Sequence, residues 1–138
     1  MKVAWLILLT SWAFSVAATP RKQIELFINA YNQHDIEKML EKTSKDVKWL
    51  YNIHDKLLIE TDGKDALRTA MIAHFKQQTH ARSRIKQSLT LGNTVAVIEE
   101  AFSNNGKRSQ CALSIYQMKQ DLIHSVTYYA ATACEFPQ

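Results

Sequence analysis

The sequence predicts an α+β fold, in which a few helices pack on one face of a curled antiparallel sheet. The segment 94–131 predicts the sheet, because three runs rich in Val, Ile, Tyr, Phe and Thr are separated by two short polar turns. The segments 20–34 and 66–78 predict the helices, because their apolar residues recur at helical spacing. Such helices are too few to cover a flat sheet, so we expect the sheet to curl around them into a cone with a pocket.

Residues 1–18 have the features of a secretory signal peptide. Lys2 supplies a positive charge, the run 3–16 is mostly apolar, and small residues end it at Ala18. The apolar run is short for a transmembrane helix, and no stop-transfer flank follows it. We therefore expect cleavage after Ala18, with an uncleaved N-terminal anchor as the alternative. The mature chain would be a single domain over residues 19–138, secreted or periplasmic and without a membrane segment.

Two helices are expected after this leader. Pro20 suits the first turn of a helix that should end near residues 32–34. Asp35 can cap a second, shorter helix. Both helices have an apolar side. In the first helix it consists of Ile24, Phe27, Ile28 and Tyr31, and in the second of Ile36, Met39 and Leu40.

A strand pair should follow these helices. The segment 46–53 alternates with period two, which is typical of a strand, and one of its faces carries Val47, Trp49, Tyr51 and Ile53. Residues 54–55 form a turn, and the segment 56–60 returns as a second short strand.

The rest of the chain is one helix followed by four strands. The helix over 66–78 has an apolar stripe that includes His74, and the next strand, over 85–91, ends at a Gly-Asn turn. Within the segment 94–131, the turns are expected at 103–106, with Asn-Gly at its tip, and at 119–121.

Charge and cysteine content limit the partners and the compartment. The net charge of +4 falls by one without Lys2, and so small an excess does not indicate nucleic acid. Cys111 lies in the second strand of the segment 94–131 and Cys134 lies just beyond the third. An exported chain with only two cysteines usually pairs them, so we expect an intramolecular disulfide. Two free thiols and an intermolecular bridge are the alternatives.

Motifs for metals, phosphate groups and nucleophilic catalysis are missing from the sequence. The five histidines are scattered and lack metal-ligand spacing. Gly residues occur only at turns, without a phosphate-binding loop. We therefore expect neither a metal site nor a cofactor.

Four segments resemble one superfamily in their order and spacing. They are FINAYNQHDIEKML, DVKW, ETDGKDALRTAMIAHF and IHSVTYYA. Together they resemble the SnoaL-like members of the nuclear transport factor 2 superfamily over nearly the whole mature chain. The resemblance implies a cone-shaped roll, close to the cystatin fold, that often dimerises through its convex sheet face. It does not imply one activity, because the superfamily includes ketosteroid isomerase, polyketide cyclases, dehydratases, epoxide hydrolases and binding modules without catalysis.

Two activities of similar folds find no match in the residues. The position of the catalytic Asp of ketosteroid isomerase falls on Tyr51, and that of its helical Tyr falls on Phe27. The position of its second Asp falls on Ser114 or Tyr116. The catalytic base is therefore missing, and isomerisation of that kind is not expected. The inhibitory loop of cystatins is also missing, which argues against protease inhibition.

The resemblance places one parity of each strand inside the cone. That parity gives an aromatic lining with a few polar tips, which is typical of a site for a small apolar ligand. The candidate ligand-binding residues are Trp49, Tyr51, His74, Ser114, Tyr116 and Tyr128. For each tyrosine and for His74 the alternative is a core position with a locally satisfied polar group.

Glu99 is the candidate catalytic residue. An inward carboxyl in an aromatic cavity would have its pKa raised by desolvation and could act as a general acid or base. The alternative is that Glu99 lies on the outer face or pairs with Arg82 or Arg84 of the neighbouring strand.

The strand residues of the opposite parity, which face outward, predict a protein partner. Apolar residues would lie on the convex face and need cover, which a homodimer supplies; they are Ile98, Phe102, Leu113 and Ile115. The function expected from the sequence is binding of a small apolar molecule, with acid–base chemistry through Glu99. The alternative is a non-catalytic binding or dimerisation module whose cavity is filled by its own aromatic side chains.

Overall fold

The computed structural model describes residues 18–103 and 107–134, which contain three helices and six strands. The helices are α1 (Pro20–Asn32), α2 (Ile36–Glu41) and α3 (Lys64–Gln77). The strands are β1 (Thr43–Ile53), β2 (Lys56–Asp62), β3 (Arg82–Leu91), β4 (Thr94–Phe102), β5 (Arg108–Lys119) and β6 (Leu122–Ala131). The order of elements predicted from the sequence is confirmed. The expected signal peptide and the tip of the expected turn at 103–106 lie outside the described residues, apart from Ala18 and Ser103.

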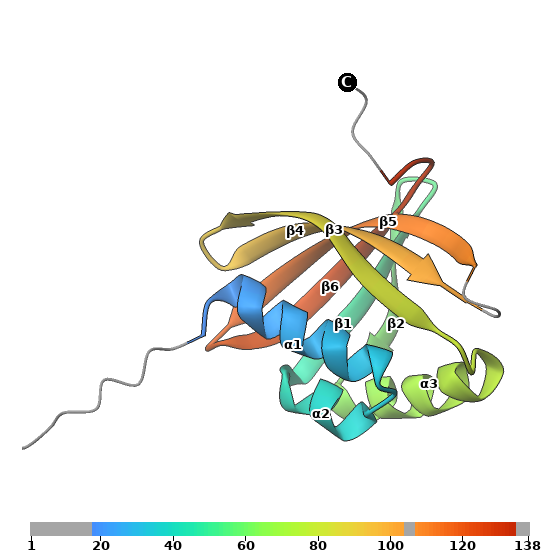
Figure 1. Cartoon of the computed structure of the whole chain (residues 1–138). Coiled ribbons are helices and arrows are strands. Elements are labelled where there is room, and N and C mark those ends of the chain that lie inside the picture. The colour runs from blue at the N-terminus through green and yellow to red at the C-terminus, as the bar shows by residue number, and fades with distance from the viewer. Residues whose placement is uncertain (1–17, 104–106, 135–138) are drawn as a thin grey trace, which may run out of the picture.

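The strands form one curled sheet in the order β2-β1-β6-β5-β4-β3. Figure 1 shows this sheet curving over the three helices, which all lie on its concave side. β2 and β3 are its two edges, so the cone is open rather than a closed barrel. The predicted α+β architecture is therefore confirmed.

One strand pair differs from the antiparallel sheet that the sequence predicted. β1 runs parallel to β6, whereas the other four neighbouring pairs are antiparallel. β1 and β6 are separated in the chain by α3 and four further strands. A tight hairpin imposes antiparallel pairing, but so long a connection allows the parallel direction.

Side-chain caps fix the entry of the first two helices. Thr19 accepts a hydrogen bond from the backbone N–H of Lys22, and Pro20 occupies the first turn of α1. Asp35 accepts one from the backbone N–H of Lys38 and so caps α2, as predicted. These caps fix the residues at which α1 and α2 begin.

Two-residue turns connect several strands with backbone in the left-handed region. His54 and Asp55 join β1 to β2 with φ of 49° and 61°, and Gln120 and Asp121 join β5 to β6 with φ of 51° and 62°. Asp suits this region better than most residues, and the twist of such turns matches that of the strands. Both turns lie where the sequence predicted them.

The core forms between α1 and the middle of the sheet. Ile24 and Phe27 of α1 are buried, as are Val47 of β1, Val97 of β4 and Val126 of β6. Phe27 also packs on Trp49, with ring centroids 5.5 Å apart. The predicted helical stripe and strand parity therefore meet in one core cluster.

Cys111 and Cys134 form a disulfide, with Cα atoms 5.3 Å apart. Cys111 lies opposite Ala131 across the β5–β6 pair, so the tail needs only a short reversal to reach it. Both cysteines are buried. Within the described residues, no helix is both long and apolar enough to span a membrane.

Candidate functional site

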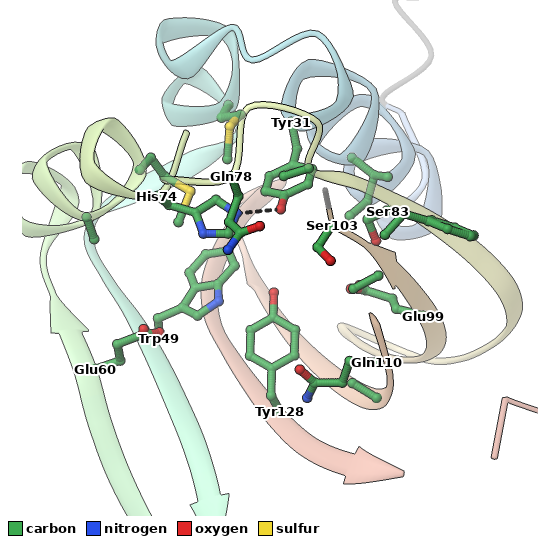
Figure 2. Close-up of a pocket in the computed structure, with 18 of the residues that line it drawn as sticks. Tyr31, Trp49, Glu60, His74, Gln78, Ser83, Glu99, Ser103, Gln110 and Tyr128 are labelled. Carbon is green, nitrogen blue, oxygen red and sulfur yellow. Dashed lines mark hydrogen bonds between the residues drawn. The ribbon is translucent and has the colours of Figure 1, made fainter. Parts of the chain in front are cut away.

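A cavity of about 470 Å³ lies between the helices and the concave face of the sheet. Every described helix and strand contributes a residue to its lining. Figure 2 shows Tyr31 and Tyr128 approaching this space from opposite sides, with Glu99 beside Ser83 and Ser103. The cavity is therefore large enough for a small molecule and has several polar groups at its surface.

Three aromatic side chains form the wall of the cavity on β1 and β6. Tyr51 lies directly opposite Tyr128 across the parallel pair, and their rings stack with centroids 5.3 Å apart. Trp49 lies 5.9 Å from Tyr128 by ring centroids. Burial raises the pKa of Tyr128 well above its usual value. Hydrogen bonding with Trp49 and Tyr116 lowers this pKa, but its effect is smaller than that of burial.

Glu99 reaches the cavity from the middle of β4. Its neighbours Val95 and Val97 share its parity and are buried in the core, which fixes its inward direction. Only 6% of Glu99 is exposed, and it belongs to the lining. The Tyr116 hydroxyl donates a hydrogen bond to Oε1 of Glu99. The outward position considered from the sequence is therefore wrong.

Burial raises the pKa of the Glu99 carboxyl from 4.5 to about 7. The hydrogen bond from Tyr116 opposes this rise because it stabilises the carboxylate, and the hydroxyls of Ser83 and Ser114 act in the same direction. Neither serine hydroxyl reaches the geometry of a full hydrogen bond among the described residues. Glu99 therefore changes its charge near neutral pH, which suits a group that accepts and returns protons.

The neighbouring carboxylate, Glu100, takes the role that the alternative interpretation gave to Glu99. Arg84 Nε lies 3.0 Å from Oε2 of Glu100, and Lys86 Nζ lies 3.8 Å from Oε1. Glu99 therefore faces the cavity from one side of β4, whereas Glu100 forms ion pairs on the other side.

Tyr31 and His74 form a second polar pair on the helical side. The Tyr31 hydroxyl lies 2.8 Å from Nε2 of His74 and joins α1 to α3. Burial raises the pKa of Tyr31 to about 12, and the charge of Glu99 adds to this effect. Burial lowers the pKa of His74, with a further contribution from His34. The pair is therefore neutral at physiological pH.

The structure places the predicted site residues at two depths. Trp49, Tyr51, His74, Glu99 and Tyr128 line the cavity. The predicted residues outside this lining are Ser114 and Tyr116, which are fully buried. They lie behind the wall because Ala112, one pleat along β5, forms the surface there.

The lining residues that were not predicted as part of the site include Tyr31, Glu60 and Phe102. Tyr31 belongs to the helical stripe, and its partner lies 43 positions away in sequence, so no local pattern indicates its role. Glu60 sits at a register shift between β1 and β2. Phe102 was expected on the convex face, but a register shift after Ala101 changes the parity there.

The part of the chain that the structure describes contains no cluster of metal-ligating side chains. No group of three or more His, Cys, Asp or Glu side chains there is close enough to hold an ion. The side chains at the cavity surface supply carboxyl, hydroxyl, imidazole and amide groups.

Comparison with known proteins identifies both the fold and the family. A cystatin-fold protein from Novosphingobium aromaticivorans has a TM-score of 0.70 at 18% identity, over 81% of this chain and 98% of its own. A Kribbella flavida protein assigned as a ketosteroid isomerase has a TM-score of 0.69 at 14% identity, over 86% of this chain and 82% of its own. TerC, crystallised with polyporic acid, has a TM-score of 0.62 at 17% identity, over 83% of this chain and 93% of its own.

The TM-scores show that the fold is shared, and because all three sequence identities are low, these likenesses establish the fold alone. No curated protein matches the sequence significantly. The family model of the SnoaL-like domain matches residues 24–126, which covers the helices α2 and α3, most of α1 and most of the sheet. The resemblance seen in the sequence is therefore confirmed, and the chain belongs to the SnoaL-like domain family.

Proposed function

We propose that this chain is an exported domain that binds a small, largely apolar molecule in its cavity and exchanges a proton with it through Glu99. The observation that carries the proposal is the position of Glu99, a buried carboxyl at the surface of a cavity of about 470 Å³. A purely structural residue at this position would be expected to be apolar, because burying an unpaired carboxylate is costly.

The chemistry follows from the charge of the carboxyl. With its pKa near 7, Glu99 is present as both acid and base at neutral pH. As a base it would remove a proton from a carbon or oxygen atom of the ligand and later return it. The hydroxyls of Tyr31 and Tyr128 at the cavity surface are suited to hold a ligand oxygen during this exchange.

The alternative of a self-filled, non-catalytic module is disfavoured by the size of the cavity. Rings of Trp49, Tyr51 and Tyr128 pack on one another along the wall rather than across the space. The disulfide supports export, because disulfides persist in oxidising compartments. With the leader removed after Ala18, the single domain would begin at Thr19.

A proton-exchange experiment tests the proposal. Trp49 is the only tryptophan of residues 19–138, so its fluorescence can report binding of β-tetralone, a fused-ring ketone with acidic C–H bonds. NMR then follows exchange of these protons for deuterium. We expect the protein to accelerate exchange by at least about tenfold, as general base catalysis allows.

The matched variants are Glu99→Gln and Glu100→Gln, which remove neighbouring carboxylates from opposite faces of β4. We expect acceleration to disappear in the first and to persist in the second. Binding without acceleration in the wild type would reduce the proposal to a binding domain. Absence of binding to β-tetralone and to a panel of polycyclic ligands, neutral and charged, would contradict it altogether.

A further inference from the structure

The concave face of the sheet carries carboxyl groups on both sides of its aromatic wall. Strand order places β2 before β1 and β6, and β5 and β4 after them. Glu60 of β2 therefore lies on one side of Tyr51 and Tyr128, and Glu99 of β4 lies on the other, all four in the cavity lining. Burial raises the pKa of Glu60 as well as that of Glu99.

Small side chains leave space between the aromatic wall at Tyr128 and the carboxyl group of Glu99. β5 separates Tyr128 from Glu99, and there Ser114 lies opposite Tyr128 and Ala112 lies opposite Glu99. Neither side chain extends far from the sheet. A ligand lying on Ala112 can therefore contact the ring of Tyr128 and the carboxyl of Glu99 together.

Positive charge is missing from the part of the lining that the structure describes. That lining contains two carboxyl groups and no lysine or arginine. The groups that face Glu99 from the surrounding elements are neutral hydroxyls, and His74 behind Tyr31 is held neutral by burial. These hydroxyls belong to Tyr31, Tyr51, Ser83, Ser114, Tyr116 and Tyr128.

We propose that the ligand is a protonated amine with an apolar, preferably aromatic, body, whose ammonium group pairs with the Glu99 carboxylate. An ammonium group supplies the counter-charge that an ionised, buried carboxylate lacks, and it can also interact with the faces of Tyr128 and Trp49. An anionic ligand would be repelled by the same carboxyl groups. The inference rests on the binding half of the proposed function and specifies its ligand class.

Pairing with an ammonium group changes the protonation of Glu99. Because a nearby positive charge favours the carboxylate, the bound amine lowers the pKa of Glu99. At about pH 7 roughly half of the unliganded molecules carry a protonated Glu99, so binding should release up to about half a proton per ligand. The released proton comes from the Glu99 carboxyl, while the amine keeps its own.

Three probes with one ring system test the proposal. They are naphthylethylamine, naphthylethanol and naphthylacetate, which are cationic, neutral and anionic at about pH 8.5, since an alkylamine has a pKa near 10 and a carboxylic acid one near 4. Calorimetry on residues 19–138 measures their affinities. We expect the amine to bind at least about tenfold more tightly than the alcohol, and the acid to bind more weakly than both.

Variants and a second readout identify the partner of the amine. Glu99→Gln should abolish the preference for the amine, whereas Glu100→Gln should keep it. Titrations at about pH 7 in buffers of different ionisation enthalpy measure proton release. Release should accompany amine binding in the wild type and disappear in Glu99→Gln.

The outcomes separate this inference from the proposed function. Equal affinity for amine and alcohol in the wild type would overturn the amine proposal while leaving ligand binding intact. An amine preference that survives in Glu99→Gln would also overturn it. If none of the probes binds, the binding half of the proposed function fails together with the inference.

Discussion

At the scale of single residues, Glu99 decides the chemistry of the cavity. Alternation along β4 could predict that Glu99 shares the parity of Val95 and Val97, and the structure buries all three. It could not predict which of two adjacent glutamates faces inward without the register. The hydrogen bond from Tyr116, 17 positions away in sequence, is a consequence of strand pairing and has no local signal.

The raised pKa of Glu99 makes stability depend on pH. The unfolded chain has the ordinary value of 4.5 and the folded one a value of about 7. Below both values the carboxyl is protonated in both states, and its contribution to the free energy of unfolding is fully present. Between them only the folded state keeps the proton, so stability falls as pH rises. We expect this residue alone to lower the free energy of unfolding by roughly 3 kcal/mol between about pH 4 and pH 8.

Urea unfolding of the wild type and Glu99→Gln across this range measures the effect. Glutamine does not titrate, so the variant should gain stability relative to the wild type as pH rises. Carboxyl groups with lowered pKa values, such as those of Asp35 and Asp46, change at more acidic pH and are common to both proteins. Parallel curves for the two proteins would show that Glu99 titrates normally.

At the scale of elements, most of the fold could be predicted from the sequence. The first turn of α1 at Pro20, the cap at Asp35 and the turn at 54–55 are local features, and each lies in the structure where residue types predicted it. The parallel pairing of β1 with β6 and the register shift before Phe102 could not be predicted. Both depend on contacts between segments that are distant in sequence, and they decide the shape of the cavity.

The disulfide ties the segment that follows β6 to β5. It closes a loop with a sequence separation of 23, and a loop of this length contributes about 3 kcal/mol in the chain-entropy model. We expect replacement of both Cys111 and Cys134 by Ala to lower the free energy of unfolding by about this amount. Urea unfolding under oxidising and reducing conditions measures it. Reductant should affect only the wild type; two alkylatable thiols in the oxidised protein would contradict the prediction.

At the scale of the whole molecule, a largely apolar row of residues crosses the convex face of the sheet. One row of paired residues crosses the sheet from Ile59 and Leu50 through Thr127, Ile115 and Ala96 to Leu89. Leu89 is 61% exposed and Ile59 is 56% exposed. A patch of this extent is a typical interface, and we propose that a second copy of the chain covers it.

Light scattering tests the dimer. Leu113 lies beside Tyr129 on this face, and both are exposed. We expect Leu113→Lys to convert a dimer into a monomer at micromolar concentration, because the charge would be buried against the partner. The matched control is Leu58→Lys, an exposed leucine whose strand neighbour Tyr51 lines the cavity. A monomeric mass for the wild type would contradict the proposal.

The cavity itself is a property of the whole molecule that the sequence could only suggest. Its volume is the space left after residues from nine elements are packed, so a pattern of residue types does not determine it. The sequence predicted the aromatic wall but not the opening above Ala112, nor Tyr31 on the opposite side. The chemistry proposed for the cavity depends on a carboxyl group that titrates in that space.

Carbon-13 NMR of the glutamate carboxyl groups tests this claim most directly. The signal missing from the spectrum of Glu99→Gln assigns Glu99, and its chemical shift is followed across the pH range. A midpoint near 7 is expected from burial in the cavity wall. A midpoint near 4.5, the ordinary value for glutamate, would show that Glu99 is solvated and would contradict its assignment as the proton-transferring group.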